Sequence, residues 1–240
     1  YIDEAALGSA IIAQVHKGTL VTGEKVAIKV QRPGIYDVMS QDIVLLKRAA
    51  TLVKVISGAQ EVVDFGMVLD EMWEIAKQEM DFQMEASHIE EFAHLNSDNE
   101  YIACPKVYRN LSTQHILVME FVEGICMDDF EGLKSRGYDV SLLGRRLGEN
   151  YVKQIIEDGY FHADPHPGNI WIRNSRIVWL DLGMMGRLST KDRLAIRKAV
   201  IALARHDTFE MKEAVLQLDL LGHEFFAFRN EDEDGVFAKI

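Results

Sequence analysis

The segment His162-Ala-Asp164-Pro-His-Pro-Gly-Asn169 constrains the fold of this chain more than any other part of its sequence. Two of the four prolines lie in it, and their fixed φ angles suit a loop that must hold its side chains still. A strand-like stretch follows at residues 177–180 and leads into Asp181-Leu-Gly183. The sequence therefore predicts a rigid polar loop, then a short hairpin that ends in an acid.

These residue types meet the requirements of magnesium-dependent phosphoryl transfer. That chemistry needs a carboxylate near the attacking oxygen, and an amide oxygen and a second carboxylate as magnesium ligands. Asp164, Asn169 and Asp181 supply the three groups. A polar loop with capping Asp and Asn would explain the segment alone, but it would not explain the hairpin and the Asp-Leu-Gly that follow.

A metal site made of His162, Asp164 and His166 is an alternative interpretation, because alternate residues of an extended loop can share one face. It leaves the intervening prolines and the remote Lys29 unexplained. We therefore rank it below phosphoryl transfer.

Lys29 ends the apolar run Val26-Ala-Ile-Lys29, where burial of an unpaired ammonium would cost several kcal/mol. In a nucleotide site its anionic partners are phosphate oxygens and a carboxylate from a facing helix. An edge-strand lysine that reaches solvent is the commoner case for a lysine alone. The polar loop downstream makes the nucleotide interpretation the stronger one.

An acidic helix is predicted to face this strand. The apolar residues that recur in steps of four and three, as in one long helix packed on a core, are Val68, Met72, Ile75, Phe82, Ala86, Ile89 and Ala93. Glu79 occupies the same seam, which indicates a buried polar partner or a functional role. Asp81 and Glu85 are four residues apart and share a face. Glu85 flanks the seam, and from there it could reach Lys29 across a cleft.

The remaining pattern predicts an α+β chain of two lobes. A hairpin joins residues 14–16 to 26–30, a helix covers 35–56, and strands are expected around 102–108 and 115–122. A helix over 142–158, strands near 170 and 178, and helices over 190–217 follow. The division near Glu123-Gly124 gives a strand-rich lobe, residues 1–123, and a mostly helical lobe, residues 124–240.

Composition excludes several classes of protein. A net charge of −12 and a pI near 5.1 argue against a nucleic-acid partner, which needs a basic face. Cys104 and Cys126 have no metal-ligand spacing, so a reducing compartment and no disulfide framework are expected. With no bilayer-length apolar run and no signal-like start, we expect the chain as given to be soluble. The abrupt ends at Tyr1 and Ile240 are consistent with a piece of a longer protein.

These segments together resemble the UbiB family of atypical protein-kinase-like proteins, also called aarF-domain or ABC1-type proteins, from about residue 7 to residue 188. The matching elements are Leu7-Gly-Ser-Ala with Ala13-Gln-Val-His16, Val26-Ala-Ile-Lys-Val-Gln-Arg-Pro-Gly34, Glu79-x-Asp81-Phe-x-x-Glu85-Ala86, His162-x-Asp164-Pro with Asn169, and Asp181-Leu-Gly183. The occurrence of all these elements in one chain is specific for this family.

The resemblance implies a two-lobed kinase fold that binds ATP and Mg²⁺. Lys29 would contact the phosphates and would pair with Glu85. Magnesium would be held by Asn169 and Asp181, and Asp164 would stand at the catalytic-base position. The further residues expected around the nucleotide are Gly8, Ser9 and Ala10 of a small-residue loop, Ala27 of the lysine strand, and Met119, Glu120 and Val122 of the hinge. Backbone N–H groups of the small loop could lie over phosphates, although a plain hairpin explains that loop nearly as well.

The resemblance also implies an ATPase or a small-molecule or lipid kinase that supports ubiquinone or prenylquinone biosynthesis. It implies contact with lipid-like quinone precursors, with other proteins of that pathway and with a membrane surface, in the cytoplasm or at a bacterial inner or organellar membrane. Two features depart from the family pattern. The first is that Ala10-Ile11 replaces the usual Ala-Ser. The second is that the sequence as given does not contain the family's Lys-x-Gly-Gln helix. Glu79 and Asp81 resemble the acids that meet this helix, so they would be left without a partner.

Two other functions compete with this one. A protein kinase is disfavoured because residues 187–191 leave no room for a long activation segment with Ala-Pro-Glu. A nucleotide-sensing scaffold without turnover is disfavoured because it would not need Asp164.

Overall fold

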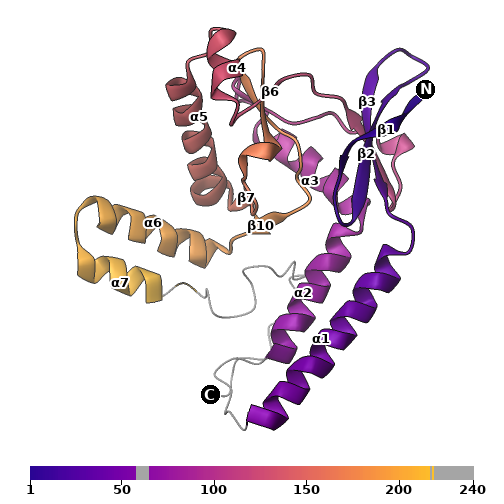
Figure 1. Cartoon of the computed structure of the whole chain (residues 1–240). Helices are drawn as coiled ribbons and strands as arrows, with labels where there is room; N and C mark the ends of the chain where they lie inside the picture. The colour runs from indigo at the N-terminus through magenta and orange to yellow at the C-terminus, as the bar shows by residue number, and fades with distance from the viewer. Residues whose placement is uncertain (58–64, 217, 219–240) are drawn as a thin grey trace. The chain divides into compact units, whose positions relative to one another are not determined.

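The structure, a computed structural model, describes residues 1–57, 65–216 and 218. Its contacts group the chain into two compact units. Among the described residues, the first unit comprises Tyr1–Asn150 with Asp164–Met185, and the second comprises Tyr151–Ala163 with residues 186–216. The lobe boundary near Glu123-Gly124 stays a prediction. The α+β class with a strand-rich N-terminal sheet is confirmed (Figure 1).

An antiparallel sheet carries the lysine strand of the first unit. Its order is β1-β2-β3-β5, with β1 at Ile2–Ser9, β2 at Ala13–Thr19, β3 at Lys25–Gln31 and β5 at Ile116–Glu120. The predicted hairpin is therefore confirmed. Lys29 pairs with Val15 on one side and with Leu117 on the other. It lies on an inner strand, so the edge-strand alternative is wrong.

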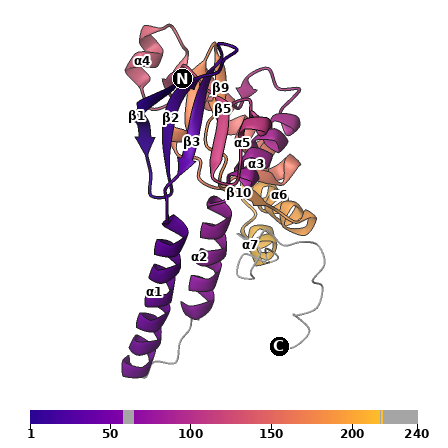
Figure 2. The same cartoon turned by 90° about the vertical axis from the view of Figure 1, so that its right-hand side faces the viewer.

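Three helices follow β3 in the chain: α1 at Ile35–Ser57, α2 at Phe65–Glu79 and α3 at Phe82–Leu95. Figures 1 and 2 both show α1 and α2 side by side. The ring centroids of Tyr36 and Trp73 lie 5.3 Å apart between these two helices.

The predicted single long acidic helix is wrong, because the chain leaves the helix between α2 and α3. Asp81 caps the N-terminus of α3 with extended backbone angles, and its carboxylate accepts a hydrogen bond from the Gln83 N–H. Val68 and Met72 of the predicted seam are exposed, whereas Phe82 on α3 is buried. On α3 the buried positions also include Ala86, Ile89 and Phe92, so Phe92 takes the core place that was predicted for Ala93.

The first unit has a second sheet next to the predicted site residues. The polar loop of residues 164–169 leads into its strand β8, and the Asp181-Leu-Gly183 turn follows its strand β9. Its order is β4-β9-β8-β6, with β4 at Ile102–Ala103, β6 at Ile125–Cys126, β8 at Ile170–Arg173 and β9 at Arg176–Trp179. The predicted strand over 102–108 is thus only two residues long. The Phe92 ring of α3 packs edge-on against the Trp179 ring at 6.1 Å, so α3 and this sheet share one core.

Short elements complete the first unit. They are the 3₁₀ turns η1 at Arg109–Leu111 and η3 at Pro167–Asn169, the helix α4 at Phe130–Ser135, and most of α5 at Val140–Lys153.

The second unit contains a π-helical turn, two strands and two helices. The turn η2 covers Gln154–Asp158 and ends at Gly159, whose φ of 65° is left-handed. The strands β7, Tyr160–His162, and β10, Met185–Arg187, pair with each other. The helices are α6 at Thr190–Ala204 and α7 at Thr208–Leu216, as predicted, while Gln217 lies outside the described residues. In the part of the chain that the structure describes, no helix is long and apolar enough to cross a membrane.

The cap at the start of α3 leads to a first prediction. Asp81→Ala should lower the free energy of unfolding by about 1 kcal/mol, because it leaves the Gln83 N–H without its acceptor. Asp81→Asn should keep most of the stability, since Asn caps helices as well as Asp does. Urea unfolding measures these free energies. Asp98→Ala is the control, because it also removes an acidic side chain but at an exposed turn position after α3, and it should leave the stability unchanged. Equal stability of Asp81→Ala and the wild type would contradict the cap.

Candidate active site

The site is built around the ammonium of Lys29. Its Nζ lies 2.8 Å from Glu85 Oε2 and 3.6 Å from Asp181 Oδ2. The Lys29 and Glu85 side chains are only 16% and 4% exposed, whereas that of Asp181 is 48% exposed. The same ammonium lies 5.3 Å from the centre of the Phe82 ring. The structure thus brings together three residues from β3, the first turn of α3 and the turn after β9.

The Asp-Leu-Gly turn approaches α3 closely. Leu182 is fully buried, and His88 Nδ1 of α3 lies 3.0 Å from its carbonyl oxygen. Asp181 Oδ1 accepts a hydrogen bond of 3.0 Å from the Gly183 N–H. A Cβ on Gly183 would lie 3.2 Å from that Asp181 oxygen, a tight contact, and 3.9 Å from Glu85 Oε2, an ordinary one, so glycine leaves room for the Asp181 carboxylate.

Charge is unbalanced in the site, because two carboxylates share one ammonium. Burial alone would lower the pKa of Lys29, but attraction to Glu85 and Asp181 more than offsets burial and raises it. Burial raises the pKa of Glu85 to about 7; the attraction of Lys29 opposes this rise and the charge of Asp181 adds to it. Glu85 Oε1 is buried without a hydrogen-bond partner, an arrangement that costs free energy and that native proteins rarely leave without reason.

Glu79 belongs to the same electrostatic environment. Partial burial raises its pKa, the charges of Asp181 and Asp164 raise it further, and Lys29 lowers it. The acid that interrupts the apolar seam therefore lies near the site, although it sits on α2 and not on the helix that carries Glu85.

The polar loop is held by bonds within itself and to the hairpin. His166 Nδ1 accepts from the Gly168 N–H at 3.1 Å, and the Asn169 carbonyl accepts from the Leu180 N–H at 2.9 Å. The last bond joins the residue predicted to bind magnesium to the residue before Asp181. Asp164 projects toward solvent with its carboxylate 58% exposed, and its Oδ2 lies 3.7 Å from His166 Nε2.

Oxygen ligands for magnesium are present but do not form a complete cage. Among the described residues, no group of three or more His, Cys, Asp or Glu could hold a metal ion by itself. The alternative site of His162, Asp164 and His166 therefore finds no support. Mg²⁺ commonly binds through one or two protein oxygens, phosphate oxygens and waters, and the half-exposed Asp181 carboxylate is a ligand of that type. Asn169 stays a predicted second ligand.

The residues predicted around the nucleotide lie on the sheet that carries Lys29. Gly8, Ser9 and Ala10 are exposed at the end of β1, where Arg32 bonds Ser9 Oγ at 2.5 Å and the Ala10 carbonyl at 2.9 Å. A Cβ at Gly8 would meet no atom within 4 Å, so packing does not require this glycine.

On the adjoining strands, Ala27 of β3 pairs with Met119 of β5, and both are buried. Glu120 uses its N–H to bond the Lys106 carbonyl and its carboxylate to bond Arg173, so it fixes the end of β5. Val122 is buried two residues further on.

The sequence interpretation missed His88. It lies three residues after Glu85 and therefore on the same face of α3, a spacing that could have revealed it.

A lysine strand, a helix that presents its glutamate, a rigid polar loop and an Asp-Leu-Gly turn define the protein-kinase-like fold. The same fold is found in the complex structure of Rv3197 with erythromycin from Mycobacterium tuberculosis, with a TM-score of 0.69 at 24% identity over 89% of this chain and 54% of that one. Residues 1–215 match the ABC1 atypical kinase-like domain. The chain belongs to this family, as its motifs predicted.

Two curated relatives illustrate the match. An uncharacterized protein of the hydrogenase 1 5′ region of Clostridium pasteurianum is 37% identical over 91% of this chain and 41% of its own length. Protein ACTIVITY OF BC1 COMPLEX KINASE 8, chloroplastic, of Arabidopsis thaliana is 34% identical over 91% of this chain and 29% of its own length. The chain thus spans less than half of either relative. A separate short match, residues 202–237, is to the C terminus of the sigma 54 modulation/S30EA ribosomal protein.

The raised pKa of Glu85 leads to a second prediction. Between about pH 4.5 and pH 7 the folded protein keeps a Glu85 proton that the unfolded chain releases, so the contribution of Glu85 to stability falls as pH rises. Relative to Glu85→Gln, the fall should approach about 1.4 kcal/mol per pH unit. Urea unfolding of both proteins across this range measures the difference.

Glu123→Gln is the matched control, because Glu123 belongs neither to the site nor to the contacts of α3. A hydrogen bond from Lys25 lowers the pKa of Glu123, so this group stabilises the folded state above its ordinary pKa and loses that effect as pH falls. Parallel pH curves for the wild type and Glu85→Gln would contradict the assignment to Glu85.

Proposed function

We propose that this chain binds Mg²⁺·ATP at the Lys29 site and transfers the γ-phosphoryl group slowly to water or to a small hydroxyl-bearing acceptor. The observation that carries the proposal is the buried ion pair of Lys29 and Glu85, with Asp181 3.6 Å from the same ammonium. Kinase-fold enzymes use this lysine–glutamate pair to hold phosphates. Membership of the ABC1 atypical kinase-like family supports a kinase-like function.

Each residue has a distinct task in the proposal. Lys29 contacts phosphate oxygens, and Glu85 holds its ammonium in place. Asn169 and Asp181 hold magnesium, which when bound offsets charge on the transferring group. Asp164, exposed in the rigid loop, orients the attacking hydroxyl and accepts its proton. Gly8, Ser9 and Ala10 cover the phosphates, while Ala27, Met119, Glu120 and Val122 surround the base.

A small acceptor is favoured over a protein by the chain that follows Asp181. β10 covers only Met185–Arg187, and Ser189 already caps α6. A protein kinase must hold an extended peptide with its hydroxyl close to the catalytic carboxylate. The segment between Asp181 and the start of α6 is too short to build a platform that holds such a peptide. The short segment favours a small acceptor; the resemblance to the UbiB family suggests its class, and on that ground we propose a quinone precursor or related lipid, in support of prenylquinone biosynthesis at a membrane surface.

A third prediction tests nucleotide binding. With ATP and Mg²⁺ at about 100 times Kd, the unfolding free energy should rise by about 2.7 kcal/mol, because the ligand binds only the native state.

Lys29→Met should weaken binding at least about tenfold, since it removes charge-assisted bonds to the phosphates. Asp181→Asn should abolish the magnesium dependence, because an amide is a poorer ligand than a carboxylate for this hard cation.

Lys25→Met is the matched control, because Lys25 lies on the same strand but forms an exposed ion pair with Glu123. It should bind as tightly as the wild type. Absence of any thermal shift with ATP or ADP in every metal would sink the proposal.

A fourth prediction concerns the acceptor. With radiolabelled ATP and Mg²⁺ the protein should release phosphate slowly and should label neither itself nor a generic protein substrate. A phenolic quinone-precursor analogue should speed release or take up the label. Strong labelling of the protein substrate that disappears in Asp164→Asn would restore the protein-kinase alternative.

A further inference from the structure

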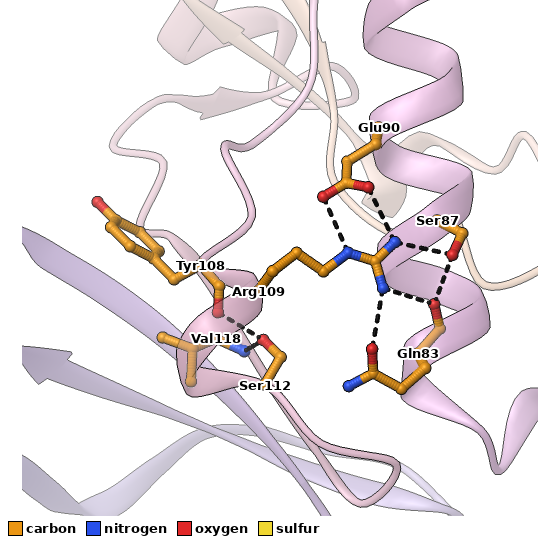
Figure 3. A network of polar contacts seen from close by, with 7 residues as sticks. All are labelled: Gln83, Ser87, Glu90, Tyr108, Arg109, Ser112 and Val118. Atoms are coloured by element: carbon orange, nitrogen blue, oxygen red, sulfur yellow. Dashed lines mark hydrogen bonds and ion pairs between the residues drawn. The ribbon is translucent and has the colours of Figure 1, made fainter.

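The helix α3 presents different residues on two opposite faces. Glu85 and His88, three residues apart, face Lys29 and the Leu182 carbonyl. Gln83, Ser87 and Glu90, spaced by four and three residues, all contact one side chain, that of Arg109 (Figure 3). At 100° per residue these two sets point in nearly opposite directions. The helix therefore stands between the site and Arg109.

All three guanidinium nitrogens of Arg109 form hydrogen bonds with residues of α3. Its Nε and one terminal nitrogen lie 2.9 Å from the two oxygens of Glu90, a bidentate pair. The same terminal nitrogen donates to Ser87 Oγ at 2.7 Å. The other terminal nitrogen donates to the Gln83 side-chain and main-chain oxygens at 2.9 Å and 3.2 Å. Such a fork fixes both the rotation and the axial position of the helix.

The turn that carries Arg109 is fastened to the sheet of Lys29. The Tyr108 N–H donates to the Val118 carbonyl at 2.9 Å, and the Val118 N–H donates to Ser112 Oγ at 3.0 Å. Ser112 Oγ in turn donates to the Tyr108 carbonyl at 3.0 Å (Figure 3). Val118 of β5 pairs with Ile28 of β3, the residue next to Lys29. Directional bonds thus connect α3 to the lysine strand.

We propose that Arg109 is a positioning residue for the nucleotide site, which holds α3 so that Glu85 reaches Lys29 and His88 reaches the Asp-Leu-Gly turn. Apolar packing of Phe82, Ala86 and Ile89 secures contact with the core but is not directional. The Arg109 fork supplies the direction. The role in nucleotide binding rests on the function proposed above.

A plain surface ion pair is the competing interpretation, because Arg109 and Glu90 are 35% and 51% exposed and such pairs add little to stability. The two interpretations differ in one respect. A positioning residue acts on nucleotide affinity through Glu85, whereas a merely stabilising pair does not depend on Glu85.

A fifth prediction uses this dependence. Arg109→Met should weaken Mg²⁺·ATP binding about five- to tenfold, the range expected for loss of several directional bonds. In a Glu85→Gln background the same substitution should have a clearly smaller effect, limited to the part that acts through His88 and the Asp-Leu-Gly turn. Arg146→Met is the matched control, because Arg146 stacks on the Tyr101 ring and does not belong to the Arg109 fork. Equal losses in both backgrounds would overturn the proposal.

A second measurement needs no nucleotide. The Lys29 ammonium is unreactive while it is paired and buried, so its acylation by an amine-reactive ester, followed by mass spectrometry, reports on the pair. Arg109→Met should speed Lys29 labelling severalfold, and Arg146→Met should not. Arg109→Lys keeps the charge without the fork and should label almost as fast as Arg109→Met. An unchanged Lys29 rate in Arg109→Met would overturn the proposal.

Two safeguards keep the test decisive. If Arg109→Met does not fold, Ser112→Ala removes the hydroxyl between Tyr108 and Val118, and it should also speed labelling, by a smaller factor. If the wild type binds no nucleotide, the proposed function fails while the labelling result still decides the role of Arg109.

Discussion

The rest of the first unit depends on one buried ammonium. Lys29 lies on an inner strand at 16% exposure, where an unpaired charge would cost several kcal/mol. Its partners Glu85 and Asp181 come from segments far away in the sequence, so the sheet, α3 and the turn after β9 must all meet at this point. Burial raises the pKa of Glu85, the attraction of Lys29 opposes this rise, and the charge of Asp181 adds to it.

The helix α3 links this ion pair to the rest of the unit. Its buried face packs Phe92 against Trp179, Glu85 and His88 hold the two sides of the site, and Arg109 holds the outer face. A small rotation of α3 would therefore change the Lys29 pair and the Asp-Leu-Gly turn together. Kinase-like folds depend on this lysine–glutamate geometry for phosphoryl transfer. In this structure the Lys29–Glu85 contact is accompanied by the directional bonds of Arg109 to α3.

Much of the fold could be predicted because local patterns sufficed. The β2–β3 hairpin, α1, the β8–β9 hairpin and α6 follow from periodicity and turn residues. The acidic helix could not be predicted correctly, because Ile75 and Phe82 are seven residues apart and the apolar rhythm stays in phase across the break. The break is marked by Asp81, whose extended backbone and capping carboxylate begin α3 as a new helix. The extent of β4 also depended on partners that lie elsewhere in the chain, since Ile102 and Ala103 pair with residues of β9.

The sequence by itself determined the family and supplied the candidate groups of the site: a lysine that needs anions, a polar loop with Asp164 and Asn169, and an acid in an Asp-Leu-Gly turn. Only the tertiary structure decided how closely these groups meet and what holds them. The 2.8 Å contact of Lys29 with Glu85, the approach of His88 to Leu182 and the grip of Arg109 on three residues of α3 join segments that are distant in the chain. Such contacts are set by the packing of helix on sheet, which no local pattern encodes.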